Sequence, residues 1–180
     1  MDISVPNAGL GTTKPGSLLK KQIPIRTFTE WEEERPGFLE IDLVAHCGNT
    51  TEGQYLNTLT CTDLCTGWTD VTALFHRSQA AVSKAIQRMR QRLPFPLLGI
   101  DSDNGGEFIN ELLYRYCLEE QITFTRSRPY QQNDQAHFEQ KNWSMVPHTV
   151  GYDRWETEPE LALLKCIYDD VRLYINFFQP

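Results

Sequence analysis

One stretch, residues 97–108, limits the folds open to this chain more than any other. It begins with the short apolar run Leu-Leu-Gly-Ile, passes through Asp101 and Asp103, and turns at Asn104-Gly105-Gly106 before a helical pattern starts. A short apolar run bounded by turn residues is typical of a buried strand. The pattern predicts a strand that delivers acidic residues to the end of an α/β sheet, where ligand groups commonly lie.

Two further carboxylates extend this acidic motif. Glu139 follows Asp103 with 35 residues between them, and Asp42 lies in an earlier apolar run. Carboxylates gathered at the ends of neighbouring elements form sites for hard divalent cations, which often serve phosphate chemistry. Phosphodiester chemistry is therefore the first hypothesis.

Several short motifs occur in a fixed order around these carboxylates. They are Phe-Leu-Glu-Ile-Asp at 38–42, Ser-Asp-Asn-Gly-Gly-Glu-Phe at 102–108, Arg-Pro-Tyr at 128–130, Asn133, and Phe-Glu-Gln-Lys-Asn at 138–142. From about residue 36 to about residue 178, the chain resembles the catalytic core of retroviral-type integrases and bacterial insertion-element transposases.

The resemblance implies a fold, a site and a reaction. The fold would be ribonuclease-H-like, with a five-stranded mixed sheet of three antiparallel and two further strands flanked by helices. Asp42, Asp103 and Glu139 would be the catalytic and metal-binding residues, holding two Mg²⁺ (or Mn²⁺) ions per active site. The reaction would be cleavage of DNA at element ends and joining of the 3′-ends to target DNA.

The residue pattern independently predicts an α/β order of elements. Strands are expected at 38–45, 54–61 and 68–75, and their short connections favour an antiparallel meander. A helix capped by Ser78 follows, then a buried strand at 97–100 next to the first, a helix marked by apolar residues from Phe108 to Tyr116, and a strand at 122–125. This order indicates a mixed sheet covered on both sides.

Two helices are expected in the last third of the chain. One should carry Glu139 and extend toward Met145. The other begins with a capping box formed by Thr157 and Glu160. Its apolar stripe is predicted to comprise Leu161, Leu164, Ile167, Val171, Tyr174 and Phe178.

Composition divides the chain into two parts. Residues 1–35 are rich in Gly, Pro, Thr and Lys and read as a linker or arm, whereas residues 36–180 would form the catalytic core that the resemblance implies. The ragged ends suggest a fragment of a longer polypeptide.

Each carboxylate also has a purely structural interpretation. Asp42 could face solvent at a sheet edge, Asp103 could form an Asx turn or cap a helix, and Glu139 could be an ordinary solvated helical residue. Asp101 competes with Asp103, because alternation in a continuing strand would point both to one face. Glu107 fits a first-turn position that complements a helix dipole.

Candidate DNA contacts cluster near Glu139. The polar loop around residues 126–133 offers guanidinium groups, amides and an aromatic ring, although an ordinary surface loop would look similar. The predicted contacts are Asn104, Arg126, Arg128, Tyr130, Gln131, Asn133 and Lys141. Lys84, Arg88 and Arg92 recur at four-residue steps, a pattern that a solvated helix face explains equally well.

The net charge of −7 argues against a free-standing DNA-binding domain. Either the acidic site is neutralised by cations while other domains supply DNA affinity, or the protein does not act on DNA. No apolar run is long enough to span a membrane and no secretory signal is visible, so the cytoplasm is expected, with nucleoid association when DNA is bound.

The expected partners are element ends and target DNA, without a membrane. A homodimer or higher synaptic oligomer is expected because two DNA ends must be held together. Two alternatives stay open: a ribonuclease-H-like nuclease without strand transfer, and a non-catalytic domain that assembles a DNA complex. Two-metal chemistry requires no general base, so His46 and His137 receive no role.

Overall fold

The structure is a computed structural model of the chain and describes residues 15–25, 35–126 and 145–179. Its centre is a five-stranded sheet in the order β3-β2-β1-β4-β5. The strands are β1 (Phe38–Ala45), β2 (Asn57–Asp63), β3 (Thr69–Leu74), β4 (Gly99–Ser102) and β5 (Thr123–Arg126). β1, β2 and β3 pair antiparallel, whereas β4 pairs parallel with both β1 and β5. The predicted mixed α/β sheet is therefore confirmed.

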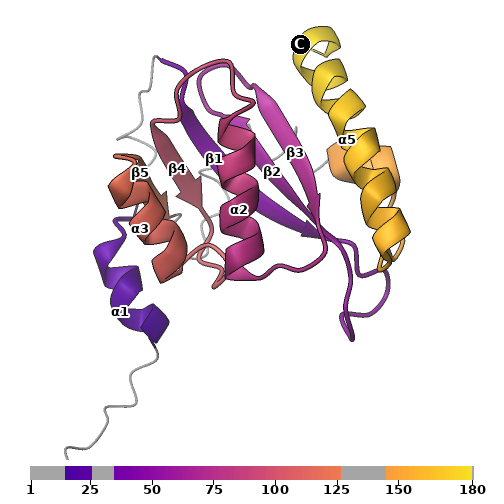
Figure 1. Cartoon of the computed structure of the whole chain (residues 1–180), viewed down its shortest axis with the longest axis horizontal. Helices are drawn as coiled ribbons and strands as arrows, with labels where there is room; N and C mark the ends of the chain where they lie inside the picture. Colours follow the sequence, from indigo (N-terminus) through magenta and orange to yellow (C-terminus); the bar gives the residue numbers. More distant parts are fainter. Residues whose placement is uncertain (1–14, 26–34, 127–144, 180) are drawn as a thin grey trace, which may run out of the picture.

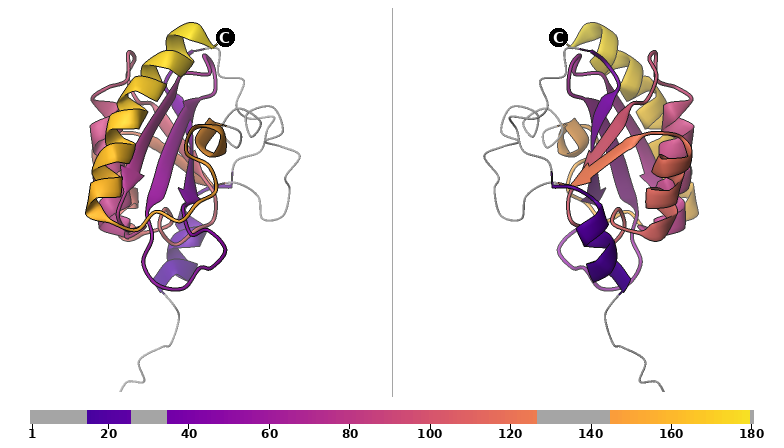
Figure 2. Two further views of the ribbon diagram at one scale, coloured as in Figure 1. Left: turned by 90° about the vertical axis from the view of Figure 1, so that its right-hand side faces the viewer. Right: turned by 90° about the vertical axis from the view of Figure 1, so that its left-hand side faces the viewer.

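Helices lie on both sides of this sheet. They are α1 (Pro15–Gln22), α2 (Gln79–Arg90), α3 (Glu111–Glu119) and α5 (Glu158–Phe178), with a further helical segment at 145–150. Figure 1 shows α2 and α3 over one face and α5 beside β3; the side views of Figure 2 place segment 145–150 on the opposite side of the sheet from α2. None of the helices in the described ranges is long and apolar enough to cross a membrane.

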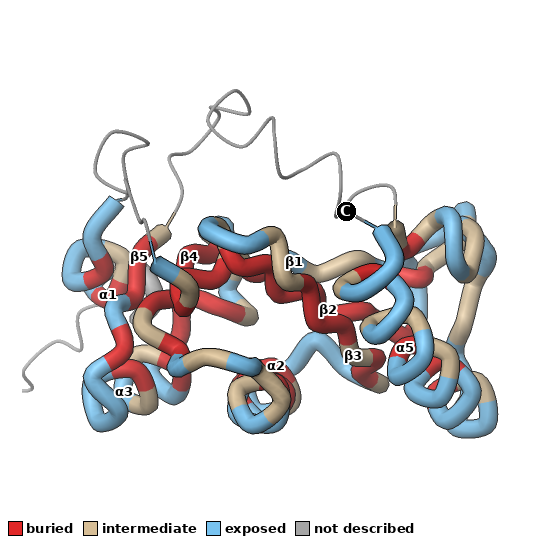
Figure 3. The backbone as a smooth tube through the Cα atoms, turned by 90° about the horizontal axis from the view of Figure 1, so that it is seen from above, coloured by how far each residue is buried: buried red, intermediate tan, exposed pale blue. Residues whose placement is uncertain are grey.

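Two apolar clusters hold these layers together. The larger includes Leu39, Ile41 and Ile100 from the sheet and is covered by α2 and α3. The smaller joins Val71 and Ala73 of β3 to α5. Seen from above in Figure 3, much of the buried backbone follows the sheet strands, with α2 and α3 to one side of them and α5 next to β3. Burial of both faces explains the apolar strand runs in the sequence.

Local capping signals are found where the sequence predicts them. The Ser78 side chain accepts a hydrogen bond from Ala81 N at the start of α2. At the start of α5, the Thr157 side chain and the Glu160 carboxylate form both halves of the predicted capping box. Such caps satisfy backbone N–H groups that would otherwise lack an intrahelical partner.

The buried face of α5 differs from the predicted stripe in its second half. Leu161 and Leu164 are buried as expected, but the face continues through Tyr168 and Ile175. Tyr174 and Phe178, predicted to be core, are 54% and 74% exposed. Asn176 explains part of this rotation, because its side chain both donates to Thr69 O and accepts from Thr69 N, which fixes the end of α5 against β3.

Residues 15–25 lie in the segment predicted to be a linker or arm. They form α1 and a following bridge in which Ile25 pairs with Arg126. Leu19 and Ile23 are buried and belong to the larger apolar cluster. Both residues thus contribute apolar surface to the fold.

Two predicted boundaries also shift. The strand expected at 54–61 is found at Asn57–Asp63, because the carbonyls of Glu52 and Gln54 accept hydrogen bonds from Arg154 and are not available to a sheet. α3 begins only after Asn110, whose side chain accepts from Leu113 N.

Candidate active site

The strand register brings Asp42 and Asp103 to the same level of the sheet. Ile41 of β1 is the partner of Ser102 of the parallel strand β4, and this is the last pair between them. Asp42 is the next residue of β1, and Asp103 is the first residue after β4. Since neighbouring strands lie about 4.8 Å apart, the backbones at these two positions are adjacent.

Asp42 lies in an electrostatically unfavourable environment for a carboxylate. Its residue surface is accessible, between a buried Ile41 and a half-buried Leu43, yet desolvation by the surrounding protein is the main cause of the raised pKa of its carboxyl group. The negative charges of Asp103 and Glu107 raise this pKa further, while the hydrogen bond from Leu43 N to Asp42 Oδ1 (2.7 Å) lowers it. A bound cation would remove this repulsion.

Asp103 and Glu107 approach each other around Gly105. Asp103 Oδ1 accepts a hydrogen bond from Gly105 N at 2.8 Å, so the Asx turn considered from the sequence is present. A Cβ atom on Gly105 would lie 2.8 Å from the Glu107 carboxyl carbon and 2.9 Å from Asp103 Oδ1. Glycine is therefore needed here for close packing of two acidic side chains.

Asp101 is separated from this group. It is 3% exposed and accepts a hydrogen bond from Thr125 Oγ1 at 2.5 Å. Asp103, by contrast, is exposed and lies just beyond the end of β4. The strand does not continue to Asp103, so the alternation that would point both aspartates to one face does not apply.

The third predicted carboxylate, Glu139, lies outside the described residues, as do Arg128, Tyr130, Gln131, Asn133 and Lys141. Within the described ranges, no three His, Cys, Asp or Glu side chains are grouped closely enough to hold a metal ion. The structure thus brings together two of the three predicted ligands, and the role of the third stays a prediction.

The two DNA-contact candidates that are described, Asn104 and Arg126, contact each other. Arg126 Nη1 donates to Asn104 Oδ1 at 3.1 Å, and Arg126 Nε donates to the carbonyls of Lys20 and Ile23. Arg126 therefore connects the residue after Asp103 to the end of α1. Its role in DNA binding stays a prediction.

Arg92 does not lie on a merely solvated face. It donates from two nitrogens to the Asp70 carboxylate, at 2.8 and 3.1 Å, and contacts Asp169 at 3.4 Å. The Asp70 side chain is fully buried. Burial raises the pKa of Asp70, and the charge of Arg92 opposes this effect.

A pocket of about 460 Å³ begins at Asp42 and extends along the end of β1. Residues 42–49 form one side, and Pro147, Gly151 and Tyr152 form the other. No local sequence pattern predicts this pocket, because its two sides are about a hundred residues apart in the chain.

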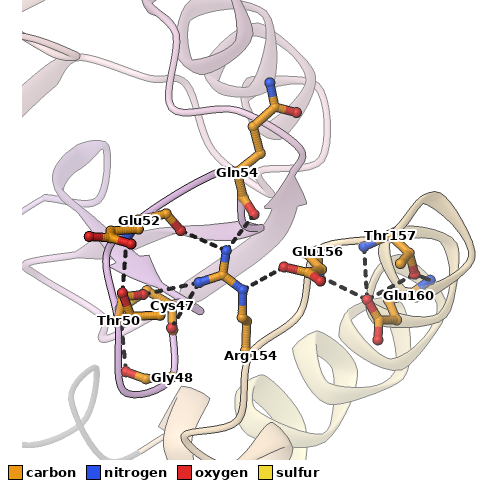
Figure 4. A network of polar contacts seen from close by, with 9 residues as sticks. All are labelled: Cys47, Gly48, Thr50, Glu52, Gln54, Arg154, Glu156, Thr157 and Glu160. Atoms are coloured by element: carbon orange, nitrogen blue, oxygen red, sulfur yellow. Dashed lines mark hydrogen bonds and ion pairs between the residues drawn. The ribbon is translucent and has the colours of Figure 1, made fainter.

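Arg154 fixes the loop that forms one side of the pocket. As Figure 4 shows, its guanidinium lies within the 47–54 loop and donates to the backbone carbonyls of this loop as well as to Glu156. The carbonyls are those of Cys47 (3.3 Å), Thr50 (3.0 Å), Glu52 (2.8 Å) and Gln54 (3.0 Å). Arg154 is thus a structural residue that sequence reasoning missed.

His46 begins a buried series of hydrogen-bonded polar side chains. Its Nε2 is 2.6 Å from Thr58 Oγ1, which is 2.7 Å from the Tyr168 hydroxyl of α5. Desolvation lowers the pKa of His46 to about 4. His46 is therefore neutral near pH 7 and joins the sheet to α5.

Comparison with known proteins agrees with this geometry. The model of the family described as "Integrase core domain" matches residues 32–132, more than half of the chain. The chain therefore belongs to the integrase core domain family, a family of polynucleotidyl transferases. This membership supports an integrase- or transposase-type function.

A relative in Sinorhizobium fredii (strain NBRC 101917 / NGR234), named uncharacterized protein y4rM, is 42% identical over 164 residues. The alignment covers 91% of this chain but 47% of that protein, so the chain spans about half the length of this curated relative.

Two solved structures share the fold. The catalytic core domain of BIV integrase superposes with a TM-score of 0.60 at 16% identity, covering 79% of this chain and 85% of that one. A chain of the simian T-cell lymphotropic virus intasome, solved in complex with the PP2A regulatory subunit B56 gamma, gives 0.62 at 15% identity, with 79% and 49% coverage. The ribonuclease-H-like fold is thereby confirmed.

Proposed function

We propose that this chain is the catalytic core of a DNA transposase or integrase that cleaves DNA at element ends and joins 3′-ends to target DNA. The observation that carries the proposal is the register of β1 and β4, which sets Asp42 beside Asp103 in a family of polynucleotidyl transferases. Residues 36–180 are proposed to form this core.

The donor groups at this edge fit a divalent cation of the Mg²⁺ or Mn²⁺ type. Asp42 lies in β1 at the level where β4 ends, Asp103 follows β4, and a third carboxylate (Glu107) is within electrostatic reach. Carboxylate oxygens are the ligands that such hard cations prefer. Asp42, Asp103 and Glu139 are the proposed metal ligands and catalytic residues, sharing two ions. Bound cations would supply Lewis-acid activation of the nucleophile and charge stabilisation at phosphorus.

The residues of the chain itself set the geometry of this site. The β1 and β4 backbones fix Asp42 and Asp103, because both strands lie inside the sheet. The hydrogen bond from Gly105 N orients one oxygen of Asp103, and Arg126 holds the neighbouring Asn104. Rigid elements of this kind keep ligands in a fixed position before substrate binds.

The first test measures metal binding by calorimetry and by thermal unfolding. Mn²⁺ at about 100 times its Kd should stabilise the wild-type chain by about 2.7 kcal/mol, or roughly 5–11 °C in Tm. Asp103→Asn should lose most of this shift. Asp170→Asn, which changes an exposed aspartate of α5, is the matched control and should keep it. Equal metal titrations for wild type and Asp103→Asn would refute the assignment of ligands.

The second test separates the three candidate activities. A Y-shaped DNA that mimics the product of strand joining is incubated with the chain and Mn²⁺, and the reaction products are resolved by length. Joined strands support a transposase or integrase, whereas hydrolysis alone favours a nuclease of the same fold. Bound but unchanged DNA favours a non-catalytic assembly domain. Asp42→Asn and Glu139→Gln should abolish either reaction.

Partners and location follow from the proposed reaction. Element ends and target DNA are the proposed substrates, and at least two copies are proposed to act together because two ends must be joined. DNA contacts are proposed at Asn104, Arg126, Arg128, Tyr130, Gln131, Asn133 and Lys141. The proposed location is the cytoplasm, at the nucleoid when DNA is bound.

A further inference from the structure

The pocket beside Asp42 is the strongest candidate for a site beyond the metal-binding carboxylates. Its volume of about 460 Å³ lies within the range of pockets that hold small organic ligands. One wall is Asp42 itself, so a group bound in the pocket would lie directly next to the proposed reaction centre.

The lining combines apolar residues with a few polar ones. Val44, Ala45 and Pro147 supply apolar surface, Asn49 supplies an amide, and Tyr152 supplies an aromatic ring. Stacking surfaces combined with hydrogen-bonding groups are the features by which proteins hold a base outside the double helix.

Tyr152 is unusual because it lines this pocket while remaining 73% exposed. The backbone explains its position. The helical segment 145–150 ends at Gly151, which has a φ of +73° and donates its N–H to Pro147 O at 2.9 Å. This left-handed end turns the chain so that the next residue, Tyr152, leaves the helix at the pocket.

The opposite wall is held in place before any ligand binds. Arg154 ties the 47–54 loop together, and its Cβ would lie 3.1 Å from a Cβ at Gly48. Trp155 N donates to His46 O, and Leu56 N donates to Trp155 O. A pocket with a fixed wall loses less conformational entropy when it binds a ligand.

From these observations we infer that the pocket receives the base of an unpaired nucleotide adjacent to the scissile phosphate, stacked on Tyr152. The inference rests on the proposed function, because it takes Asp42 as the place where the phosphodiester reacts. A nucleotide whose phosphate lies at Asp42 has its base one sugar away, and the pocket begins at that carboxylate.

The experiment compares Tyr152 variants on Y-shaped DNAs that carry a single abasic residue at each position around the junction. Tyr152→Ala should slow the Mn²⁺-dependent reaction on intact DNA about fivefold to a hundredfold, the range for loss of one base–aromatic stack. Tyr152→Phe should retain most of the rate. At one abasic position, wild type and Tyr152→Ala should react equally, because the base that the ring contacts is already missing.

Tyr174→Ala is the matched control. Tyr174 is 54% exposed on α5, close to Asn176, which bonds to Thr69 at the end of the sheet away from Asp42. This variant should react like wild type on every DNA. Equal Tm values for both alanine variants show that a slow reaction is not caused by unfolding.

A binding measurement keeps this inference separable from the proposed function. 2-Aminopurine placed at the same junction positions should change fluorescence on binding wild type in Ca²⁺, and less so on binding Tyr152→Ala. A wild-type chain that shows the fluorescence change but no reaction refutes the proposed activity and supports the pocket. A reacting chain in which Tyr152→Ala slows all abasic DNAs equally, or none, overturns the pocket assignment alone.

Discussion

Arg154→Ala is expected to loosen the 47–54 loop and destabilise the whole fold. The change removes hydrogen bonds to four backbone carbonyls and the ion pair with Glu156. Water can replace the guanidinium at carbonyls of an exposed loop, so each bond is counted at the low end, about 0.5–1 kcal/mol. The sum is a loss of about 2–4 kcal/mol.

The assay is thermal unfolding combined with amide hydrogen exchange. For a domain of this size the expected loss lowers Tm by about 4–16 °C. Exchange should accelerate at residues 47–54, because four carbonyls of this loop lose the hydrogen bonds from Arg154 that hold them in place. Arg154→Lys should recover only a minor part of the loss, since one ammonium group cannot reach carbonyls spread around a planar fork.

Arg115→Ala is the control for removing an arginine from the surface. Arg115 is 69% exposed and pairs with Glu111 one helical turn away, an interaction worth about 0.2–0.5 kcal/mol. Its Tm should fall by no more than about 2 °C. Similar Tm values for Arg115→Ala and Arg154→Ala, with unchanged exchange at 47–54, would refute the role given to Arg154.

Two further predictions concern buried charge. The fold lowers the pKa of His46 to about 4, so the unfolded chain binds more protons than the folded chain between that pH and about 6.5. The free energy of unfolding should therefore decrease as the pH is lowered through this window. Urea titrations of His46→Gln should show a smaller decrease. Arg92→Ala leaves the Asp70 carboxylate buried without its bidentate partner and should cost about 3–5 kcal/mol near pH 7. Since the raised pKa of Asp70 then favours proton uptake by the folded chain, this cost should shrink at pH 4, and a constant cost across pH would contradict the explanation.

The sequence predicted best those features whose signals lie close together in the chain. The strand meander, the Ser78 cap and the Thr157–Glu160 capping box depend on neighbouring residues and are found in the structure. The positions of Asp42 and Asp103 were also predictable, because Asp42 lies within a short strand pattern, Asp103 follows another, and both belong to motifs that resemble a known family.

The features that were not predicted correctly depend on contacts between residues far apart in the sequence. α5 carries apolar residues on more than one side, and only packing on Val71 and Ala73 decides that Tyr168, rather than Tyr174, is buried. α1 looked like part of a linker because its short amphipathic pattern is weak until Ile23 meets the core. Arg154 contacts carbonyls 100 or more residues away, a relation with no periodic signal.

Two aspartates on neighbouring strands show why one end of the sheet is suited to chemistry and the other to stability. Asp63, at the end of β2, is fully buried and accepts hydrogen bonds from Gly37 N, Thr66 N and Thr66 Oγ1. Its charge is thus balanced within the chain, as expected of a structural residue. Asp42, farther along β1 where β4 ends, accepts from Leu43 N and is close to the like charges of Asp103 and Glu107. A carboxylate bonded to several donors stabilises its own fold, whereas one that is desolvated beside two like charges gains stability from a bound cation. This difference is the physical basis for proposing a cation site at Asp42.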